Sequence, residues 1–299
     1  MGSLEWKELT AEETVLVQNA LPVSRINDLV RYSGGVVVPR EFTKIAERLQ
    51  TFSLRHDDIW VVTFPKCGTT WAQETISMIV NDIDPAVRNL PLALRSPFLE
   101  LGAILGDATD NLTGLPSEVA QVRKDPLTYA ENMSCQRILK VHMPLEFLPP
   151  DLTKKCKVVY VARDPRDVCV SYFKHYQVMP GHGYIGSFRE FEELFQSGLT
   201  LFGDFWHHLH SGWRMRNEPN VKFLWFQDMK QNQRGVIEEL SSFLNHPLSS
   251  STVDLLENHL QFENMKDNIN VNPTISLHLK SNFMRKGEVG KSKNAILLI

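Results

Sequence analysis

The sequence predicts an α/β fold, a mostly parallel sheet flanked by helices, in one domain that spans residues 1–299. Two short apolar runs are each followed by a turn and an amphipathic helix, and two further apolar runs are candidates for neighbouring strands. Strands that alternate with helices favour parallel pairing through right-handed crossovers. A chain of 299 residues with 42% hydrophobic side chains can bury one large core, and no linker or repeat of fixed period divides it.

The first strand is expected at residues 59–64, a run rich in β-branched residues that ends at Pro65. Residues 65–71 then form a tight turn that leads into a helix. The apolar positions of this helix recur at helical spacing through Ala72, Ile76, Ile79, Val80 and Ile83. We therefore expect a strand, loop and helix unit that extends to Ile83.

The second unit begins with an apolar strand at residues 158–162, after which Asp164-Pro165 supplies an N-cap and a first-turn proline for the next helix. Residues 137–142 and 221–226 are the two further strands. Ligands of open parallel sheets bind at the carboxyl ends of the strands. Both loops and His142 fall at such ends.

Composition and charge exclude several classes of protein. The net charge of −3, from 32 basic and 35 acidic residues, argues against a broad nucleic-acid-binding surface. The first eighteen residues are too charged for a signal peptide, and no apolar run approaches the roughly 20 residues of a membrane span. We expect a soluble cytoplasmic protein with neither a nucleic-acid nor a membrane partner.

Cysteine and histidine usage indicates neither disulfides nor a metal. The four cysteines are too few and too scattered to staple a domain of this size, so we expect free thiols. His207, His208 and His210 form the one histidine cluster, and no carboxylate or cysteine stands at ligand spacing from it. We expect no metal in this protein.

The turn after the first strand has the residues that a phosphate requires. Lys66, Gly68, Thr69 and Thr70 combine a cation, a glycine that permits close approach, two hydroxyls and the N–H groups of a helix N-terminus. The Walker pattern itself is absent, because the lysine precedes the glycine. The pattern predicts a P-loop-like nucleotide-binding architecture, and it disfavours a kinase or NTPase, since no convincing magnesium carboxylate accompanies it.

Four blocks of the sequence resemble the cytosolic sulfotransferases, in that family's order. Residues 63–71 resemble the phosphosulfate-binding loop, residues 137–144 the strand with the catalytic histidine, residues 160–172 the grip on the 3′-phosphate, and residues 285–287 the late nucleotide motif. The resemblance implies a transferase that moves a sulfuryl group from PAPS, 3′-phosphoadenosine 5′-phosphosulfate, to a hydroxyl of a small acceptor and releases PAP.

The resemblance also assigns catalytic roles that fit the chemistry of the residues. His142 would accept the proton of the acceptor hydroxyl, because an imidazole titrates near neutral pH. Lys66 would stabilise charge on the leaving phosphate, and Lys140 would orient the acceptor or the transferring group. The same comparison implies PAPS as co-substrate, with contacts from Lys66, Cys67, Gly68, Thr69, Thr70, Trp71, Arg163, Ser171, Phe226, Phe262, Met265, Arg285, Lys286 and Gly287.

Some of these assignments have competing interpretations. Trp71 and Phe262 could stack on the adenine or simply pack in the core. Arg163 could grip the 3′-phosphate or pair with a neighbouring aspartate. Cys67 stands where the family usually has serine, and Phe226 where it has tyrosine, so Phe226 can pack on the nucleotide but cannot donate a hydrogen bond.

The acceptor site is expected to be apolar. Its walls would come from Phe64, Phe98, Lys140, His142 and Phe147, which imply a phenol, a steroid-like alcohol or a retinoid as acceptor.

The C-terminus departs from the family pattern. Residues 291–299 replace the usual continuation, which includes a dimerisation motif. We therefore expect a monomer with weakened PAP binding. The alternative function is a catalytically weak or inactive relative that binds PAPS or PAP.

Overall fold

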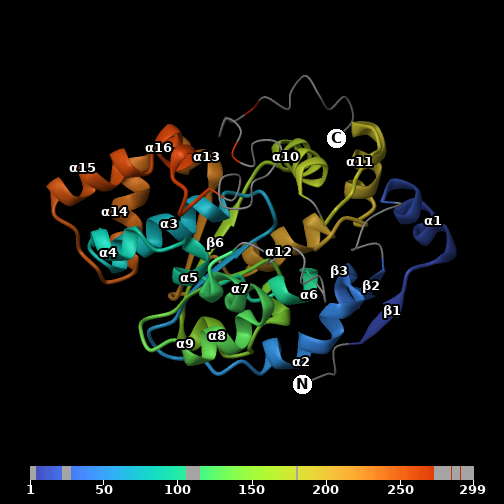
Figure 1. The fold of residues 1–299 in the computed structure, drawn as a ribbon, viewed down its shortest axis with the longest axis horizontal. Helices are drawn as coiled ribbons and strands as arrows, with labels where there is room; N and C mark the ends of the chain where they lie inside the picture. The colour runs from blue at the N-terminus through green and yellow to red at the C-terminus, as the bar shows by residue number, and fades with distance from the viewer. Residues whose placement is uncertain are drawn as a thin grey trace.

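The computed structural model describes residues 5–21, 28–105, 115–179 and 181–272, together with Met284 and Gly290. It confirms the predicted α/β fold: four parallel strands in the order β5-β4-β6-β7 form a sheet that is flanked by helices (Figure 1). The strands are β4 (Ile59–Thr63), β5 (Ile138–Val141), β6 (Lys157–Ala162) and β7 (Val221–Trp225).

The helices of the described residues fall mostly between these strands and after them. Those before β6 are α1 (Ala11–Ala20), α2 (Thr43–Gln50), α3 (Thr69–Val80), α4 (Pro85–Arg88), α5 (Leu92–Arg95), α6 (Leu101–Leu105), α7 (Ser117–Lys124), α8 (Pro126–Asn132) and α9 (Leu152–Lys155), with the 3₁₀ turns η1 (Ser33–Gly35), η2 (Arg40–Phe42) and η4 (Leu145–Phe147). Those after β6 are α10 (Pro165–Val178), α11 (Phe188–Gln196), α12 (Phe205–Met215), α13 (Phe226–Gln231), α14 (Gln233–Phe243), α15 (Ser250–His259) and α16 (Phe262–Asp267).

A second, antiparallel sheet lies near the N-terminus and was not expected from the sequence. Its strands are β1 (Trp6–Glu8), β2 (Leu29–Tyr32) and β3 (Val37–Pro39), in that order. Two backbone hydrogen bonds attach β3 to the segment before α12: Val37 donates to the Gly203 carbonyl at 2.6 Å, and Phe202 donates to the Val37 carbonyl at 2.8 Å. This sheet therefore helps to hold Phe202 in place.

The expected helix after the first strand is shorter than its apolar pattern suggests. Helix α3 ends at Val80, and Ile83 lies in a turn with a positive φ of 56°. Asn81 occupies the C-cap, and its side-chain amide donates to the Ser77 carbonyl at 2.8 Å. An apolar residue just past a helix end continues the pattern without continuing the helix.

The expected strands also differ from the observed ones at their ends. The first strand stops at Thr63, one residue early, and the strand expected at 137–142 is Ile138–Val141. Strand β6 begins one residue before the expected position, at Lys157. The last strand ends at Trp225, because the following residue begins α13.

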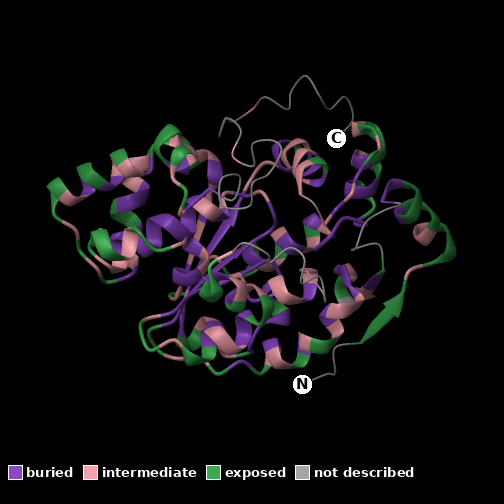
Figure 2. Ribbon diagram, viewed as in Figure 1, coloured by how far each residue is buried: buried purple, intermediate pink, exposed green. Residues whose placement is uncertain are grey.

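Both faces of the parallel sheet are largely buried, which explains why its strands are mostly apolar. Alternate residues such as Trp60, Val62 and Tyr160 pack into one apolar cluster, which also contains side chains of α10 and α11. The residues between them, such as Val61 and Val159, pack on the other face with side chains of α3, α14 and α15. Figure 2 shows the buried strands in the centre and the exposed outer surfaces of the surrounding helices.

The sheet order brings three strand ends together. Because β4 lies between β5 and β6, the loop into α3, the residue after β5 and the loop into α10 are neighbours at the carboxyl edge. The N-cap expected at Asp164 is confirmed, since its carboxylate accepts from the Arg166 N–H at 2.9 Å. This edge is where the candidate site residues gather.

Candidate active site

The loop between β4 and α3 has the conformation of a phosphate-binding turn. Lys66 and Gly68 both have positive φ, 68° and 104°, and Gly68 occupies the N-cap of α3 without a side-chain cap. A Cβ atom on Gly68 would lie 2.6 Å from the Phe226 ring, so only glycine fits there. The N–H groups of the first turn of α3 are thus positioned for an anion.

Arg163 joins the second loop to the first. Its guanidinium donates to the Lys66 carbonyl at 3.0 Å and lies 4.3 Å from the centre of the Phe226 ring. The neighbouring Asp164 forms an ion pair with Arg166 at 2.7 Å. The sequence predicted Arg163, Lys66 and Phe226 as parts of one nucleotide site, and the structure brings these three together.

A network of short contacts fixes the ring of His142. Its Nδ1 lies 2.7 Å from the Thr63 carbonyl oxygen and 3.3 Å from the Thr63 hydroxyl, and that hydroxyl is 2.6 Å from the hydroxyl of Thr69. A carbonyl oxygen can only accept, so Nδ1 must carry the proton of the neutral ring. The lone pair of the imidazole is therefore on Nε2.

The surroundings keep His142 neutral. Burial, together with the positive charges of Lys140 and Lys66, lowers the pKa of His142 well below its usual range. Burial also lowers the pKa of Lys140 to about 8. At neutral pH this pair consists of an unprotonated imidazole and a charged ammonium, which suits a base beside an electrostatic stabiliser.

Glu100 supports His142 and was missed by the sequence analysis. It is fully buried, and its Oε1 accepts from the backbone N–H groups of His142 at 2.7 Å and of Met143 at 2.9 Å. Burial raises the pKa of Glu100 to about 7. The one available signal was a lone carboxylate within the apolar run of residues 97–101.

Two aromatic rings pack against the imidazole of His142. The ring of Phe98 lies 4.8 Å from the imidazole, that of Phe202 lies 5.4 Å from it, and the Lys140 ammonium is 3.9 Å from the centre of the Phe98 ring. Phe98 was predicted as an acceptor contact, whereas Phe202 was not. Phe202 lies 60 positions along the chain from His142, beyond the range of local patterns.

Two other predicted acceptor contacts lie deeper in the core. The ring of Phe64 packs edge-on against Tyr172 and Phe205, and that of Phe147 packs against Tyr32. Both residues are buried, and their role as acceptor walls stays a prediction.

The remaining predicted nucleotide contacts lie on several elements. Trp71 and Met265 are buried in the same apolar cluster as Phe226, while Phe262 is half-buried at the start of α16. Thr70 and Ser171 are half-buried on α3 and α10. Their contacts with a nucleotide stay predictions. Arg285, Lys286 and Gly287 lie outside the described residues, as do residues 291–299, on which the predicted monomer and weakened PAP binding depend.

Cys67 occupies the middle of the nucleotide loop. Its thiol is fully buried, and burial raises its pKa to about 12. It therefore stays protonated at neutral pH and can contribute a backbone N–H and volume, but no thiolate.

Two members of the histidine cluster have protein partners. His208 is buried, its Nε2 lies 3.1 Å from the His142 carbonyl, and its Nδ1 lies 2.6 Å from the Tyr160 hydroxyl. His207 forms an ion pair with Glu146. Within the described part of the chain, no group of three or more histidine, cysteine or acidic residues could hold a metal ion. No helix there is long and apolar enough to cross a membrane.

Comparison with known proteins adds independent findings. The model of the sulfotransferase domain family matches residues 56–297. Sulfotransferase 1A1 of Canis lupus familiaris is 34% identical over 271 residues, which cover 88% of this chain and 86% of that protein. Human sulfotransferase 1E1 is 33% identical over 268 residues, with coverages of 87% and 85%. A crystal structure of retinol dehydratase in complex with androsterone and the inactive cofactor PAP superposes with a TM-score of 0.90 at 28% identity, over 99% of this chain and 92% of that one.

Proposed function

Because this chain belongs to the sulfotransferase family, we propose that it sulfates the hydroxyl group of a small apolar acceptor, namely a phenol, a steroid-like alcohol or a retinoid. The chain is a PAPS-dependent sulfotransferase, so the sulfuryl group comes from PAPS and PAP is the second product. The identity of the acceptor and the roles of individual residues are the parts that we propose.

The observation that carries the proposed mechanism is the hydrogen bond from His142 Nδ1 to the Thr63 carbonyl. It leaves Nε2 as the atom that takes the proton from the acceptor hydroxyl. The acceptor oxygen then forms its bond to sulfur as the bond from sulfur to the phosphate oxygen breaks. Lys66 stabilises the negative charge that develops on that phosphate oxygen.

The nucleotide is held by the two loops that follow β4 and β6. The N–H groups of the first turn of α3 and the hydroxyls of Thr69 and Thr70 bind the 5′-phosphate group, and Arg163 binds the 3′-phosphate. In this assignment Lys66 and Arg163 provide the positive charge that a metal ion provides in many phosphoryl transferases.

The apolar character of the acceptor is supported by the rings of Phe98 and Phe202 beside His142. It is also supported by two retinol dehydratase structures with TM-scores of 0.90, one in complex with androsterone and one with retinol. Apolar walls with a few polar groups at one end bind a largely apolar molecule by its hydroxyl.

The test is transfer of label from ³⁵S-labelled PAPS to a panel of acceptors: 1-naphthol, a 3-hydroxysteroid, retinol and, as a hydrophilic comparison, glucose. We expect transfer to at least one apolar acceptor and none to glucose. Replacement of His142 by alanine should lower kcat by roughly 10²–10⁴-fold, because general base catalysis contributes that much. PAP affinity should stay within about threefold of the wild-type value, since the base contacts the acceptor and not the nucleotide.

The matched control is His210→Ala, which removes an exposed histidine of α12 and should change neither quantity. Lys66→Ala should lower both kcat and PAP affinity. Near-normal turnover of the His142 variant at neutral pH would show that the base is another residue. PAP binding without transfer to any acceptor of the panel would favour the catalytically weak relative.

A further inference from the structure

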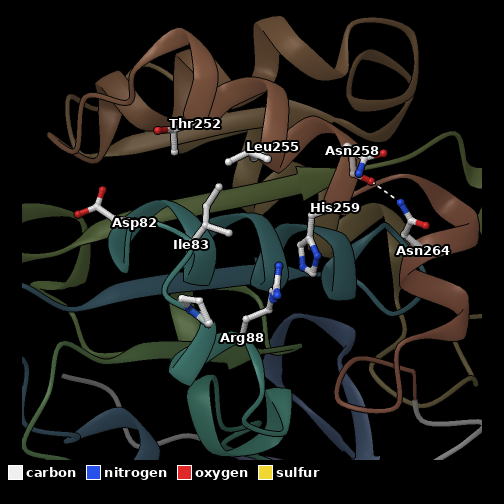
Figure 3. A pocket seen from close by; sticks show the side chains of 9 residues that line it. Asp82, Ile83, Arg88, Thr252, Leu255, Asn258, His259 and Asn264 are labelled. Carbon is white, nitrogen blue, oxygen red and sulfur yellow. Dashed lines mark hydrogen bonds between the residues drawn. The ribbon is translucent and has the colours of Figure 1, made fainter.

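A cavity of about 520 Å³ shares no residue with the candidate active site. It lies between the turn that follows α3, with α4, on one side and α15 and α16 on the other (Figure 3). The α15 residues that line it include Leu255 and His259, which lie on one face of that helix because they are four positions apart.

The cavity contains the positive charge of an arginine. Arg88 lines it and is half-buried, and within the described residues its guanidinium takes part in no hydrogen bond or ion pair. The buried carboxylate of Glu74, which contacts the lining residue His259, already has two partners: it pairs with Arg95 at 2.7 Å and with His259 Nε2 at 2.7 Å. Glu74 therefore does not serve as the counterion of Arg88.

The remaining lining combines aliphatic side chains and carboxamides with Thr252, His259 and Asp82. Ile83 and Leu255 supply aliphatic surface, and Leu255 is unusual among large apolar side chains in being 65% exposed. Asn258 and Asn264 add carboxamide groups near His259. Among the described residues that line the cavity, the only carboxylate is that of Asp82, which lies at the other end of the cavity from His259 and Asn264 in Figure 3.

We propose that this cavity binds a small organic anion with an apolar body, the anionic group against Arg88 and the body against Ile83 and Leu255. A guanidinium forms paired hydrogen bonds with planar or tetrahedral oxyanions, and half-burial strengthens such a contact relative to an exposed one. The exposed side chain of Leu255 lies in the same cavity, and covering it with an apolar group lowers the free energy of the complex.

Two kinds of molecule share this chemistry. One is an aromatic or aliphatic carboxylate. The other is a sulfate ester, which is the class of product that the proposed function releases. Only for the sulfate ester does the inference rest on the proposed function. In the second case the cavity is a product site separate from the place of reaction.

The test observes the cavity directly by NMR of protein with ¹³C-labelled isoleucine δ1 methyl groups, and Ile83→Val assigns the Ile83 signal. The probes are 1-naphthyl sulfate, 1-naphthoate and neutral 1-naphthol, each titrated with saturating PAP present. We expect the two anions to shift the Ile83 signal saturably and the naphthol to leave it unchanged. Arg88→Met should weaken the binding of the anions at least tenfold. Arg88→Lys keeps the charge and should weaken their binding less.

Arg214→Met removes an exposed arginine of α12 and is the matched control, which should bind as the wild type does. A shift with the sulfate ester alone supports a product site, and a shift with the carboxylate alone supports a site for another metabolic anion. The inference is overturned by the absence of any shift, by an equal shift with naphthol, or by unchanged affinity in Arg88→Met. Because the readout is binding at Ile83, it does not depend on whether the protein transfers sulfuryl groups.

Discussion

In the proposed mechanism, the pH range of activity depends on the protonation of His142 and Lys140. Burial and the nearby positive charges lower the pKa of His142 well below 6.5, so the base of the proposed mechanism is unprotonated at neutral pH. Lys140, with a pKa of about 8, is charged below that pH and loses its proton above it. In the proposed mechanism, Lys140 therefore limits activity on the alkaline side, and Glu100, whose pKa burial raises to about 7, also changes its charge near neutral pH.

We predict that kcat/KM for PAPS falls above about pH 8, by roughly tenfold per pH unit where one deprotonation controls the rate. This parameter reports the free enzyme, in which no nucleotide charge raises the pKa of the lysine. In Lys140→Arg the charge persists, because guanidinium groups stay protonated, so the alkaline fall should disappear even if the absolute rate is lower. If kcat/KM of this variant still fell above about pH 8, the group that titrates there would not be Lys140.

A second prediction concerns Glu100, whose Oε1 accepts from the His142 and Met143 N–H groups. Glu100→Gln retains an acceptor in the same position and should keep kcat within a few-fold of the wild type. Glu100→Ala leaves two buried donors unpaired, at about 1–3 kcal/mol each, and should lower kcat by roughly 10- to 100-fold as His142 shifts.

PAP affinity, measured by calorimetry, separates positioning from general damage. It should be unchanged in both Glu100 variants, because Glu100 does not touch the nucleotide loop. A Glu100→Gln variant as slow as Glu100→Ala would show that the charge, rather than the hydrogen bonds, is what matters.

These residues also mark the limit of inference from the sequence. The sequence placed His142 at a strand end, with Lys140 two positions earlier, and the structure has both beside Phe98. Thr63 and Glu100 could not be assigned to His142, because they lie 79 and 42 positions from it. A local pattern reports the spacing of neighbours, and contacts of this kind depend on how the strands are ordered.

At the scale of elements, the two loops at the carboxyl edge hold each other. Arg163 of the loop after β6 binds the Lys66 carbonyl of the loop after β4, and Phe226 at the start of α13 lies against both Arg163 and Gly68. The nucleotide loop is thus shaped by two later segments as well as by its own sequence.

We predict that Gly68→Ala weakens PAP binding by at least about tenfold and destabilises the protein by about 1–3 kcal/mol, because the new Cβ adds strain at a positive φ and contacts Phe226. Gly181→Ala is the control: a Cβ there meets no atom within 4 Å, so little should change. Calorimetry with PAP and thermal unfolding would compare the two variants. Equal behaviour of both would contradict the assigned role of the Gly68 turn.

Elements with a strong apolar signal were predictable, and those without one were not. The four parallel strands are largely buried on both faces, so their sequences are mostly apolar, and all four were expected. Strand β1 is exposed along its three residues and pairs only through its backbone with β2, so no periodicity identifies it. The predicted end of α3 was wrong because an apolar signal was present where no helix is: Ile83 is apolar but lies beyond the last helical residue, Val80.

At the scale of the whole molecule, one buried ion pair ties together the starts of β4 and β5. The Arg137 guanidinium contacts both carboxylate oxygens of Asp58, at 2.6 and 2.5 Å, and both side chains are almost completely buried. Arg137 also donates to the Ser53 carbonyl at 2.8 Å. Such a pair is costly to break, because a single charge left in the core has no compensation.

We predict that Arg137→Met destabilises the protein by about 3–5 kcal/mol, measured by urea unfolding, since the buried carboxyl of Asp58 then loses its partner. The double variant with Asp58→Asn removes that carboxyl but keeps an acceptor for the Arg55 N–H, which Asp58 binds at 2.8 Å. It should recover a substantial part of the loss. A single variant within about 1 kcal/mol of the wild type would mean that water or another donor replaces the arginine.

The order of the strands has a consequence for how the protein is made. The central strand β4 leaves the ribosome before both of the strands that pair with it, and its bond from Thr63 to His142 spans 79 positions. At about 5–20 residues per second, synthesis of that interval takes roughly 4–16 s. Throughout this time the apolar run at residues 59–63 has no partner strand on either edge. In the nascent chain this run is therefore accessible to chaperones before it can pair within the sheet.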